Sequence, residues 1–229
     1  MVGEQNKGRS KEALSFIEKN MANQPICIDC YPYTAGSTVL SADRAASSTR
    51  VIVSWSKSLP EYAGQDLDVI AKKLGVSQEE AIRRLSPAGG IYFRLDEADV
   101  QTILKHDKVM IGSDGLPHDA SPHPRLWGTF PRVLGHYVRD ERVLTLEAAV
   151  HKMSGMPAAR MGLTERGVLR EGAFADVAVF DPATVADRAT FQAPHQYPVG
   201  IPYVIVNGRL AVDGGRYTGV RAGRVLRKP

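Results

Sequence analysis

Two units in which a helix precedes a strand restrict the fold of this chain more than any other feature of its sequence. Residues 10–20 carry apolar side chains at helical spacing, and residues 25–33 follow as a short apolar run typical of a strand. The same order recurs where the helical pattern of 97–106 leads into the apolar residues of 108–112. Helices that alternate with buried strands indicate an α/β fold.

The segment between these units, at about 41–97, is expected to be an insertion with a small structure of its own. Residues 51–55 have the composition of a strand, and two short helical patterns follow. Ser77 is the expected N-cap of the second of these helices, with Glu80 completing a capping box. Ser10 is the expected N-cap of the first helix of the chain.

The character of the sequence changes after Gly167, where turn residues separate runs rich in β-forming side chains. We therefore place a boundary near residue 165. The expected domains are 1–165, which is α/β and contains the insertion, and 166–229, which is a small β-rich subdomain.

The net charge of +4 comes from the carboxyl-terminal tail. Five basic residues and no acidic residue follow Asp213, so residues 1–213 carry a formal charge of −1. A basic face across the fold, which nucleic-acid binders usually carry, is therefore not expected. No apolar run approaches the ~18 residues of a membrane helix, no secretory signal is recognisable, and two cysteines cannot build a disulfide framework. These features predict a cytoplasmic protein that binds neither nucleic acid nor membranes.

Asp114 is the strongest candidate for a catalytic residue. It follows the apolar strand pattern of 109–112 directly, where a loop begins. In α/β folds the carboxyl ends of the strands form the active face, and a carboxylate there can bind a metal or move protons. The alternative is an aspartate that only caps the turn before Gly115.

Two further groups of polar residues suit a site for an anionic substrate. Tyr31, Tyr33 and Ser37 follow the first strand pattern, and their hydroxyls are suitable anchors for a carboxylate or carbonyl. Arg125 follows the loop after Asp114 and can bind a carboxylate in bidentate fashion. The alternatives are a structural turn with core tyrosines, and a surface salt bridge for the arginine.

Local metal binding is a further hypothesis. Asp114, His118 and His123 lie within ten residues of one another, but prolines between them indicate a loop rather than a helical ligand face. Cys27 and Cys30 are expected to be structural thiols on opposite faces of a strand, because no second pair completes a zinc site. No nucleotide-binding glycine motif or serine-hydrolase motif is present.

Several segments together resemble the N-acyl-D-amino-acid deacylases, or D-aminoacylases, of the amidohydrolase superfamily. The resemblance extends from about Gly8 to the end of the chain. It is carried by the segments GRSKEAL, DCYPYTAGST, PAGGIYF, IGSDGLPHD, PHPRLWGTFPRVLGHYVRD and GVLREGAFADVAVFDPATV. The run from IGSDG to GHYVRD is highly specific, whereas the GAFADVAVFD signature marks only the superfamily.

This resemblance implies a fold and a reaction. The fold would be α/β, with the last strands and helices of a metal-dependent TIM barrel, an insertion, and then a small β-sandwich. The reaction would be hydrolysis of an N-acyl-D-amino acid to a carboxylate and a D-amino acid by zinc-activated water. By resemblance Asp114 would be the general base and acid, and Tyr31, Ser37 and Arg125 would surround the substrate's α-carboxylate.

One departure from the family is large. The family's metal ligands lie on an HxH pair, a bridging cysteine and a Ser-His-His-Lys motif, all upstream of the residues that match this chain. No metal ligand is therefore assigned here, and an amino-terminal half is expected to be missing. The alternative to an enzyme is an inactive truncated fragment, or a non-catalytic protein that associates with other chains.

Overall fold

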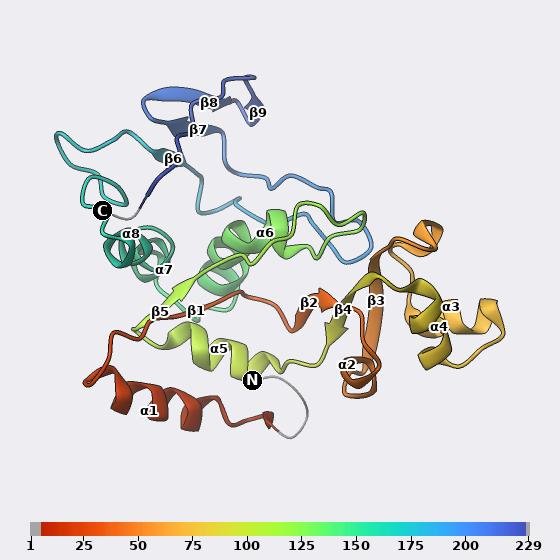
Figure 1. The fold of residues 1–229 in the computed structure, drawn as a ribbon. Coiled ribbons are helices and arrows are strands. Elements are labelled where there is room, and N and C mark those ends of the chain that lie inside the picture. Colours follow the sequence, from red (N-terminus) through yellow and green to blue (C-terminus); the bar gives the residue numbers. More distant parts are fainter. Residues whose placement is uncertain (1–5, 228–229) are drawn as a thin grey trace.

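A pair of parallel strands lies at the centre of the molecule (Figure 1). The computed structural model describes residues 6–227. Strand β1 (Ile28–Cys30) pairs with β5 (Val109–Ile111), and Asp29 lies opposite Met110. The two strands expected from the helix-then-strand units are therefore neighbours, as an α/β fold requires. Their assignment to a barrel stays a proposal.

Helices cover this strand pair. Helix α1 packs against α5, while α5 and α7 both contact β5. The helices of this part are α1 (Ser10–Met21), α5 (Glu97–Lys105), α6 (Arg125–Arg132), the π-helix η3 (Val133–Asp140), α7 (Leu146–Met153) and α8 (Gly155–Met161). The periodicities that predicted helices over 10–20 and 97–106 are confirmed to within two residues.

One apolar core joins these elements. Its buried residues come from α5, β5, η3, α7 and the short connection before α7, and from the carboxyl-terminal segment through Val185. They are Val100, Leu104, Ile111, Val133, Leu134, Tyr137, Leu144, Ala149 and Val185. Because Val185 is completely buried there, the segment after residue 166 shares a core with the α/β part. The boundary near 165 stays a prediction.

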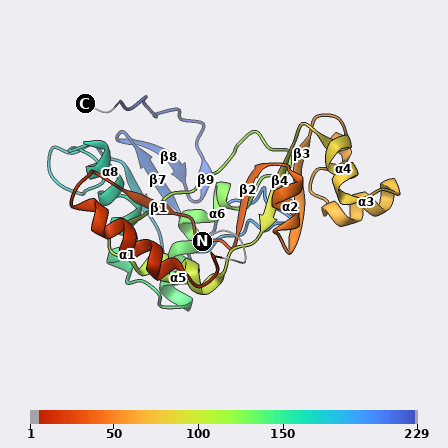
Figure 2. The same cartoon turned by 60° about the horizontal axis from the view of Figure 1, so that its bottom comes forward.

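Residues 35–93, which include most of the insertion expected at about 41–97, form a separate lobe with its own core, seen at one end of the molecule in Figure 2. An antiparallel sheet in the order β2-β4-β3 is its framework. Its elements are β2 (Ala35–Val39), α2 (Ala42–Ala46), β3 (Arg50–Ser56), the short 3-10 helix η2 (Pro60–Tyr62), α3 (Leu67–Leu74), α4 (Gln78–Leu85) and β4 (Ala88–Phe93). The Ser77 side chain accepts a hydrogen bond from the Glu80 N–H, so the predicted cap of α4 is confirmed.

The carboxyl-terminal region contains one antiparallel sheet. Its strands follow one another in the order β6-β7-β8-β9. They are β6 (Val177–Val179), β7 (Tyr203–Val206), β8 (Arg209–Asp213) and β9 (Arg216–Tyr217). None of these strand residues is buried. Residues 6–227 supply this one sheet to the region, so the second layer of a β-sandwich stays a prediction.

No helix within residues 6–227 is long and apolar enough to cross a membrane. The helices that do form are held by packing and by capping groups, and the first of them is capped in an unexpected way.

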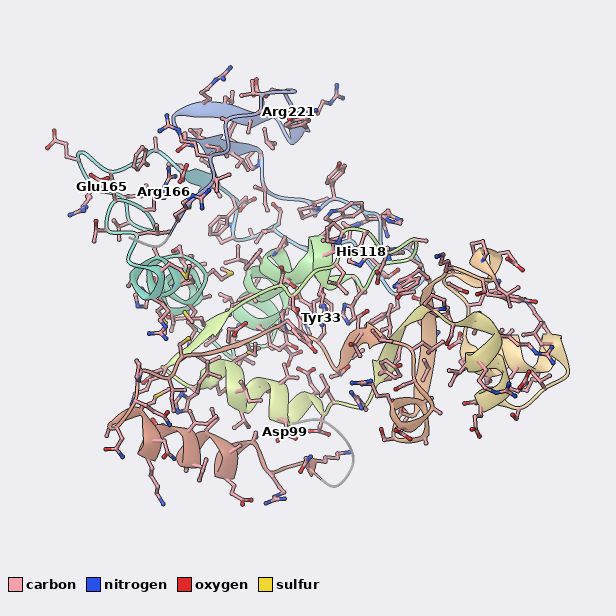
Figure 3. The ribbon with its side chains drawn as sticks, viewed as in Figure 1. Tyr33, Asp99, His118, Glu165, Arg166 and Arg221 are labelled. Atoms are coloured by element: carbon pink, nitrogen blue, oxygen red, sulfur yellow. The ribbon has the colours of Figure 1, made fainter. Side chains whose placement is uncertain are left out.

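Asp99 of α5 holds the beginning of α1. Its two carboxylate oxygens accept hydrogen bonds from the Gly8 N–H at 2.8 Å and the Ser10 N–H at 3.3 Å. Ser10 is the first residue of the helix and makes no cap with its side chain, so its prediction as N-cap was wrong. The residue that satisfies the free N–H groups lies 89 positions away in the sequence. Figure 3 shows Asp99 between α5 and the start of the chain.

These hydrogen bonds also set the charge state of Asp99. Burial raises the pKa of its carboxyl, but the hydrogen bonds from Ser10 and Gly8 outweigh burial and leave the pKa below the ordinary value. The folded state therefore favours the ionised form. Its contribution to stability is complete above the unfolded pKa and disappears as the pH falls through the folded pKa.

We expect Asp99→Ala to lower the free energy of unfolding at pH 7 by about 1–2 kcal/mol, because two N–H groups lose their acceptor. The difference in the free energy of unfolding between wild type and Asp99→Ala should become smaller as the pH falls below about 4, where the wild-type carboxylate becomes protonated. Urea unfolding followed by circular dichroism at several pH values measures both effects. Asp68→Ala, which removes an exposed carboxylate near Lys72, is the control and should change little. A difference in unfolding free energy that does not vary with pH would contradict the role of the ionised Asp99 carboxylate as the acceptor at the start of α1.

Candidate functional site

Asp114 lies three residues beyond the end of β5, at the carboxyl end of the parallel strand pair. Its backbone has a φ of 48°, in the left-handed region that few side chains other than Asn and Asp tolerate. The side chain is 63% exposed. The loop therefore presents this carboxylate outward, at the position predicted for a catalytic aspartate.

Arg125 is the partner of Asp114. It is the first residue of α6, and its side chain is only 1% exposed. The Nη2 atom of Arg125 lies 2.8 Å from an Asp114 carboxylate oxygen. The same nitrogen donates to the Ser37 backbone oxygen at 3.3 Å, and the guanidinium carbon lies 4.6 Å from the centre of the Tyr31 ring. Arg125 therefore contacts Asp114, Ser37 and Tyr31, the three residues that the resemblance places with it in the site.

Two polar atoms around Arg125 have no hydrogen-bond partner among residues 6–227. They are the Nε of Arg125 and the Oγ of Ser37, and both are buried. Arg125 contacts Ser37 at its backbone oxygen, which leaves the Ser37 hydroxyl without a protein partner. A buried donor and a buried hydroxyl without partners are costly unless a ligand can satisfy them.

A cavity of about 370 Å³ opens between β1 and α5 beside this ion pair. Its lining combines two carboxylates, two tyrosines and apolar side chains. The residues are Asp29, Cys30, Tyr31, Tyr33, Leu95, Val100, Ile103 and Asp114. Such a mixed lining suits a small organic molecule with one charged group. Figure 3 labels Tyr33 near the middle of the molecule, beside α6.

Burial keeps both tyrosines of this cavity protonated. Desolvation raises the pKa of the Tyr31 hydroxyl, and the nearby Arg125 opposes the shift without cancelling it. Desolvation and the Asp187 carboxylate also raise the pKa of Tyr33. Both hydroxyls are therefore neutral hydrogen-bond donors at physiological pH.

His123 fixes the start of α6. Its Nδ1 accepts a hydrogen bond from the Arg125 backbone N–H at 3.0 Å, which leaves the ring proton on Nε2. Nε2 lies 3.0 Å from the Ala35 backbone oxygen on β2 and donates to it. Burial, followed by the charge of Arg125, lowers the pKa of His123 to about 3, so the ring is neutral. Both ring nitrogens are used, and neither is free to bind a metal.

The hypothesis of a local metal site is therefore not supported by the geometry. His118 is 70% exposed, whereas His123 is buried, so the two rings do not converge. No group of three His, Cys, Asp or Glu side chains within residues 6–227 could hold a metal ion. Cys27 is exposed and precedes β1, and burial raises the pKa of Cys30 to about 12. Burial therefore disfavours the thiolate form of Cys30, which is the form that binds a metal.

Sequence reasoning missed the positioning role of His123 and the part played by Phe191. The His-Pro-Arg order is the local signal that a ring nitrogen can accept the N–H two residues later. Phe191 packs with its ring centre 5.0 Å from that of His123, and 4.7 Å from that of Phe93. It comes from the long connection between β6 and β7, and no local pattern indicates that contact.

Comparison with known proteins shows what this chain is similar to. A family model described as the amidohydrolase family matches residues 43–212. The chain is 54% identical to a D-aminoacylase of Alcaligenes xylosoxydans xylosoxydans over 226 residues, which cover 99% of this chain and 47% of the relative. It is 52% identical to an N-acyl-D-aspartate deacylase of the same organism, covering 99% of this chain and 45% of that protein.

A solved structure is similar over nearly the whole chain. It is the crystal structure of an N-acyl-D-glutamate deacylase from Bordetella bronchiseptica, complexed with zinc and a phosphonate inhibitor that mimics the tetrahedral intermediate. It has a TM-score of 0.92 and 47% identity, and the match covers 99% of this chain and 48% of that one. The chain thus spans about half the length of the curated relatives it matches. Because the family model covers more than half of its residues, this chain belongs to the amidohydrolase family.

Proposed function

We propose that this chain provides the proton-transfer and carboxylate-binding half of an enzyme that hydrolyses N-acyl-D-amino acids. The products would be a carboxylic acid and a free D-amino acid. The observation that carries the proposal is the convergence of Asp114, Tyr31 and Ser37 on the buried guanidinium of Arg125. The relatives named above, which act on D-amino acid derivatives, support the substrate class.

Arg125 is the proposed binding group for the substrate's α-carboxylate. A buried guanidinium offers paired N–H donors in a geometry that matches a carboxylate, and burial strengthens the attraction. The Ser37 hydroxyl and the neutral Tyr31 hydroxyl are proposed to donate further hydrogen bonds to the same group. These contacts would place the amide of the substrate close to Asp114.

Asp114 is the proposed general base and acid. Its carboxylate would accept a proton from the attacking water while the water oxygen forms a bond to the amide carbon. The C–N bond would then break, and Asp114 would return the proton to the leaving nitrogen. Its exposed position at the end of β5 suits this role, since the carboxylate can reach both the water and the leaving group.

Zinc does not fit the described residues as a bound group, because residues 6–227 hold no cluster of three suitable ligands. The zinc requirement expected from the resemblance would concern an assembled enzyme in which another segment supplies the ligands. In the same assembled enzyme, the other segment is proposed to complete the barrel and to supply the second layer of the β-sandwich.

The experiment that tests the function is assembly of this chain with the amino-terminal half of the D-aminoacylase relative. We expect the co-purified complex to hydrolyse N-acetyl-D-methionine and to leave the L-enantiomer intact. Asp114→Asn should lower kcat by about 10²- to 10⁴-fold, because the carboxylate can no longer move the proton. Asp140→Asn, at an exposed carboxylate of η3, is the control.

The outcome is decisive once assembly is demonstrated by size-exclusion chromatography. A confirmed complex without turnover would favour the alternative of an inactive or purely associating chain. Full activity in the Asp114→Asn complex would contradict the role of Asp114 and leave the reaction class open to another base.

Replacing Arg125 by Lys tests carboxylate binding. A lysine keeps the charge but loses the planar pair of donors, so KM should rise by about 10- to 100-fold with a smaller change in kcat. Steady-state kinetics of the assembled enzyme on N-acetyl-D-methionine measure the changes in KM and kcat separately. Arg44→Lys, at an exposed arginine of α2, is the matched control. An unchanged KM would exclude Arg125 as the binding group.

The neutral state of His123 predicts a pH dependence of stability. In the unfolded chain the ring binds a proton near its ordinary pKa of about 6.5, whereas the folded chain does so only near 3. Stability should therefore be complete above about pH 6.5 and fall as the pH is lowered, by up to about 1.4 kcal/mol per pH unit from this group. Replacing His123 by Gln removes the titration but keeps an amide donor for the Ala35 oxygen.

We expect the His123→Gln chain to be less stable than wild type at pH 7 but to lose less stability between pH 6 and pH 4. Urea unfolding at several pH values gives both slopes. His118→Gln, at an exposed histidine of the same loop, controls for the loss of a surface histidine. Equal slopes for wild type and His123→Gln would contradict a neutral buried ring.

A further inference from the structure

The Asp114–Arg125 ion pair joins two very different partners. Arg125 is buried and held in place on several sides, by the His123 ring at its backbone N–H, by the Ser37 oxygen and by the Tyr31 ring. Asp114 is 63% exposed on a loop. One partner is therefore fixed, and the other can move away into solvent without uncovering a core.

We propose that Asp114 is an internal competitor for the carboxylate that Arg125 binds. In the free chain its carboxylate occupies the guanidinium, and an incoming carboxylate displaces it. This inference rests on the proposed function, because the incoming group is taken to be the α-carboxylate of an N-acyl-D-amino acid. It adds a regulatory contact within that site, in which capture of the substrate and release of the base are one exchange.

An exchange of this kind requires that the incoming carboxylate bind Arg125 more favourably than Asp114 does, through hydrogen bonds that Asp114 does not make. The buried Nε of Arg125 and the buried Oγ of Ser37 supply that difference, because neither has a partner among the described residues 6–227. Asp114 meets the guanidinium at Nη2, and Nε stays without a partner. A carboxylate that approaches from the cavity lined by Tyr31 and Asp114 can use donors that the internal pair leaves unused.

The exchange also orders the reaction. While Asp114 is paired with Arg125, one of its carboxylate oxygens lies 2.8 Å from Nη2 and is engaged by the guanidinium rather than turned toward the amide of a substrate. A substrate carboxylate on Arg125 ends that pairing and leaves Asp114 free beside the amide. An N-acylamine without a carboxylate cannot do so, and the base then stays engaged. Selectivity for acylated amino acids would follow from proton transfer as well as from binding.

The test uses the 229-residue chain itself and measures binding, so it needs neither metal nor turnover. N-acetyl-D-methionine is titrated into wild type and Asp114→Asn, with calorimetry for affinity and the NMR signal of the Arg125 Nε–H as the local probe. We expect Asp114→Asn to bind about 3- to 10-fold more tightly, because the competing charge is gone. N-acetyl-D-methioninamide, which has no carboxylate, should bind neither protein.

Two further variants make the result decisive. Asp114→Gly accepts the positive φ of this position and should also bind more tightly, which covers a failure of the Asn variant to fold. Asp140→Asn removes an exposed carboxylate that pairs with Arg139, away from the cavity, and should leave the affinity unchanged. Equal or weaker binding in both Asp114 variants would overturn the proposal, as would the absence of binding in all proteins.

The two hypotheses fail in different ways. If the assembled enzyme does not hydrolyse N-acetyl-D-methionine, the proposed function fails, while tighter binding by Asp114→Asn would still support the exchange. If hydrolysis proceeds but the Asp114 variants bind no more tightly than wild type, only the inference fails.

Discussion

The burial of one guanidinium organises the functional region of this chain. A buried arginine must be paired and hydrogen-bonded, because an isolated charge in an apolar setting is costly. Arg125 meets this requirement with the Asp114 carboxylate from the loop after β5 and the Ser37 oxygen from β2. His123 adds a link between the start of α6 and β2 through the Ala35 oxygen. The parallel strand pair, the lobe that contains β2 and the loop after β5 are thus tied together at the place where chemistry is proposed.

The rest of the described chain buries its apolar residues unevenly. The core around β5 and the core of the insertion are well packed, but no residue of β6, β7, β8 or β9 is buried. Among residues 6–227, β1 and β5 pair only with each other, so each strand has an outer edge that no further strand covers. Such edges and faces are the surfaces on which further strands can add. The proposed site therefore lies at the end of a strand pair whose outer edges are uncovered, so added strands could border the site.

Local patterns predicted the local structure well. Periodicity placed α1 and α5, and the Ser77–Glu80 spacing placed the start of α4, because each depends on residues a few positions apart. The cap of α1 could not be read this way, since Asp99 lies far along the chain. The contact of Phe191 with His123 could not be predicted either, because these residues too lie far apart in the sequence. Candidate site residues were recognised by their chemistry, but that Ser37 would offer its backbone oxygen to Arg125 follows only from the register of β2.

The geometry separates two tasks that an amide hydrolase has to combine. The described residues handle charge and protons, with a neutral buried histidine that positions a cation, two protonated tyrosines, and an exposed carboxylate. They do not collect metal ligands, since both nitrogens of His123 are occupied and His118 points elsewhere. The exposed carboxylate is instead held against a fixed cation. In the proposed exchange, another anion of the same shape releases it, so the contact that stabilises the free site also selects the ligand.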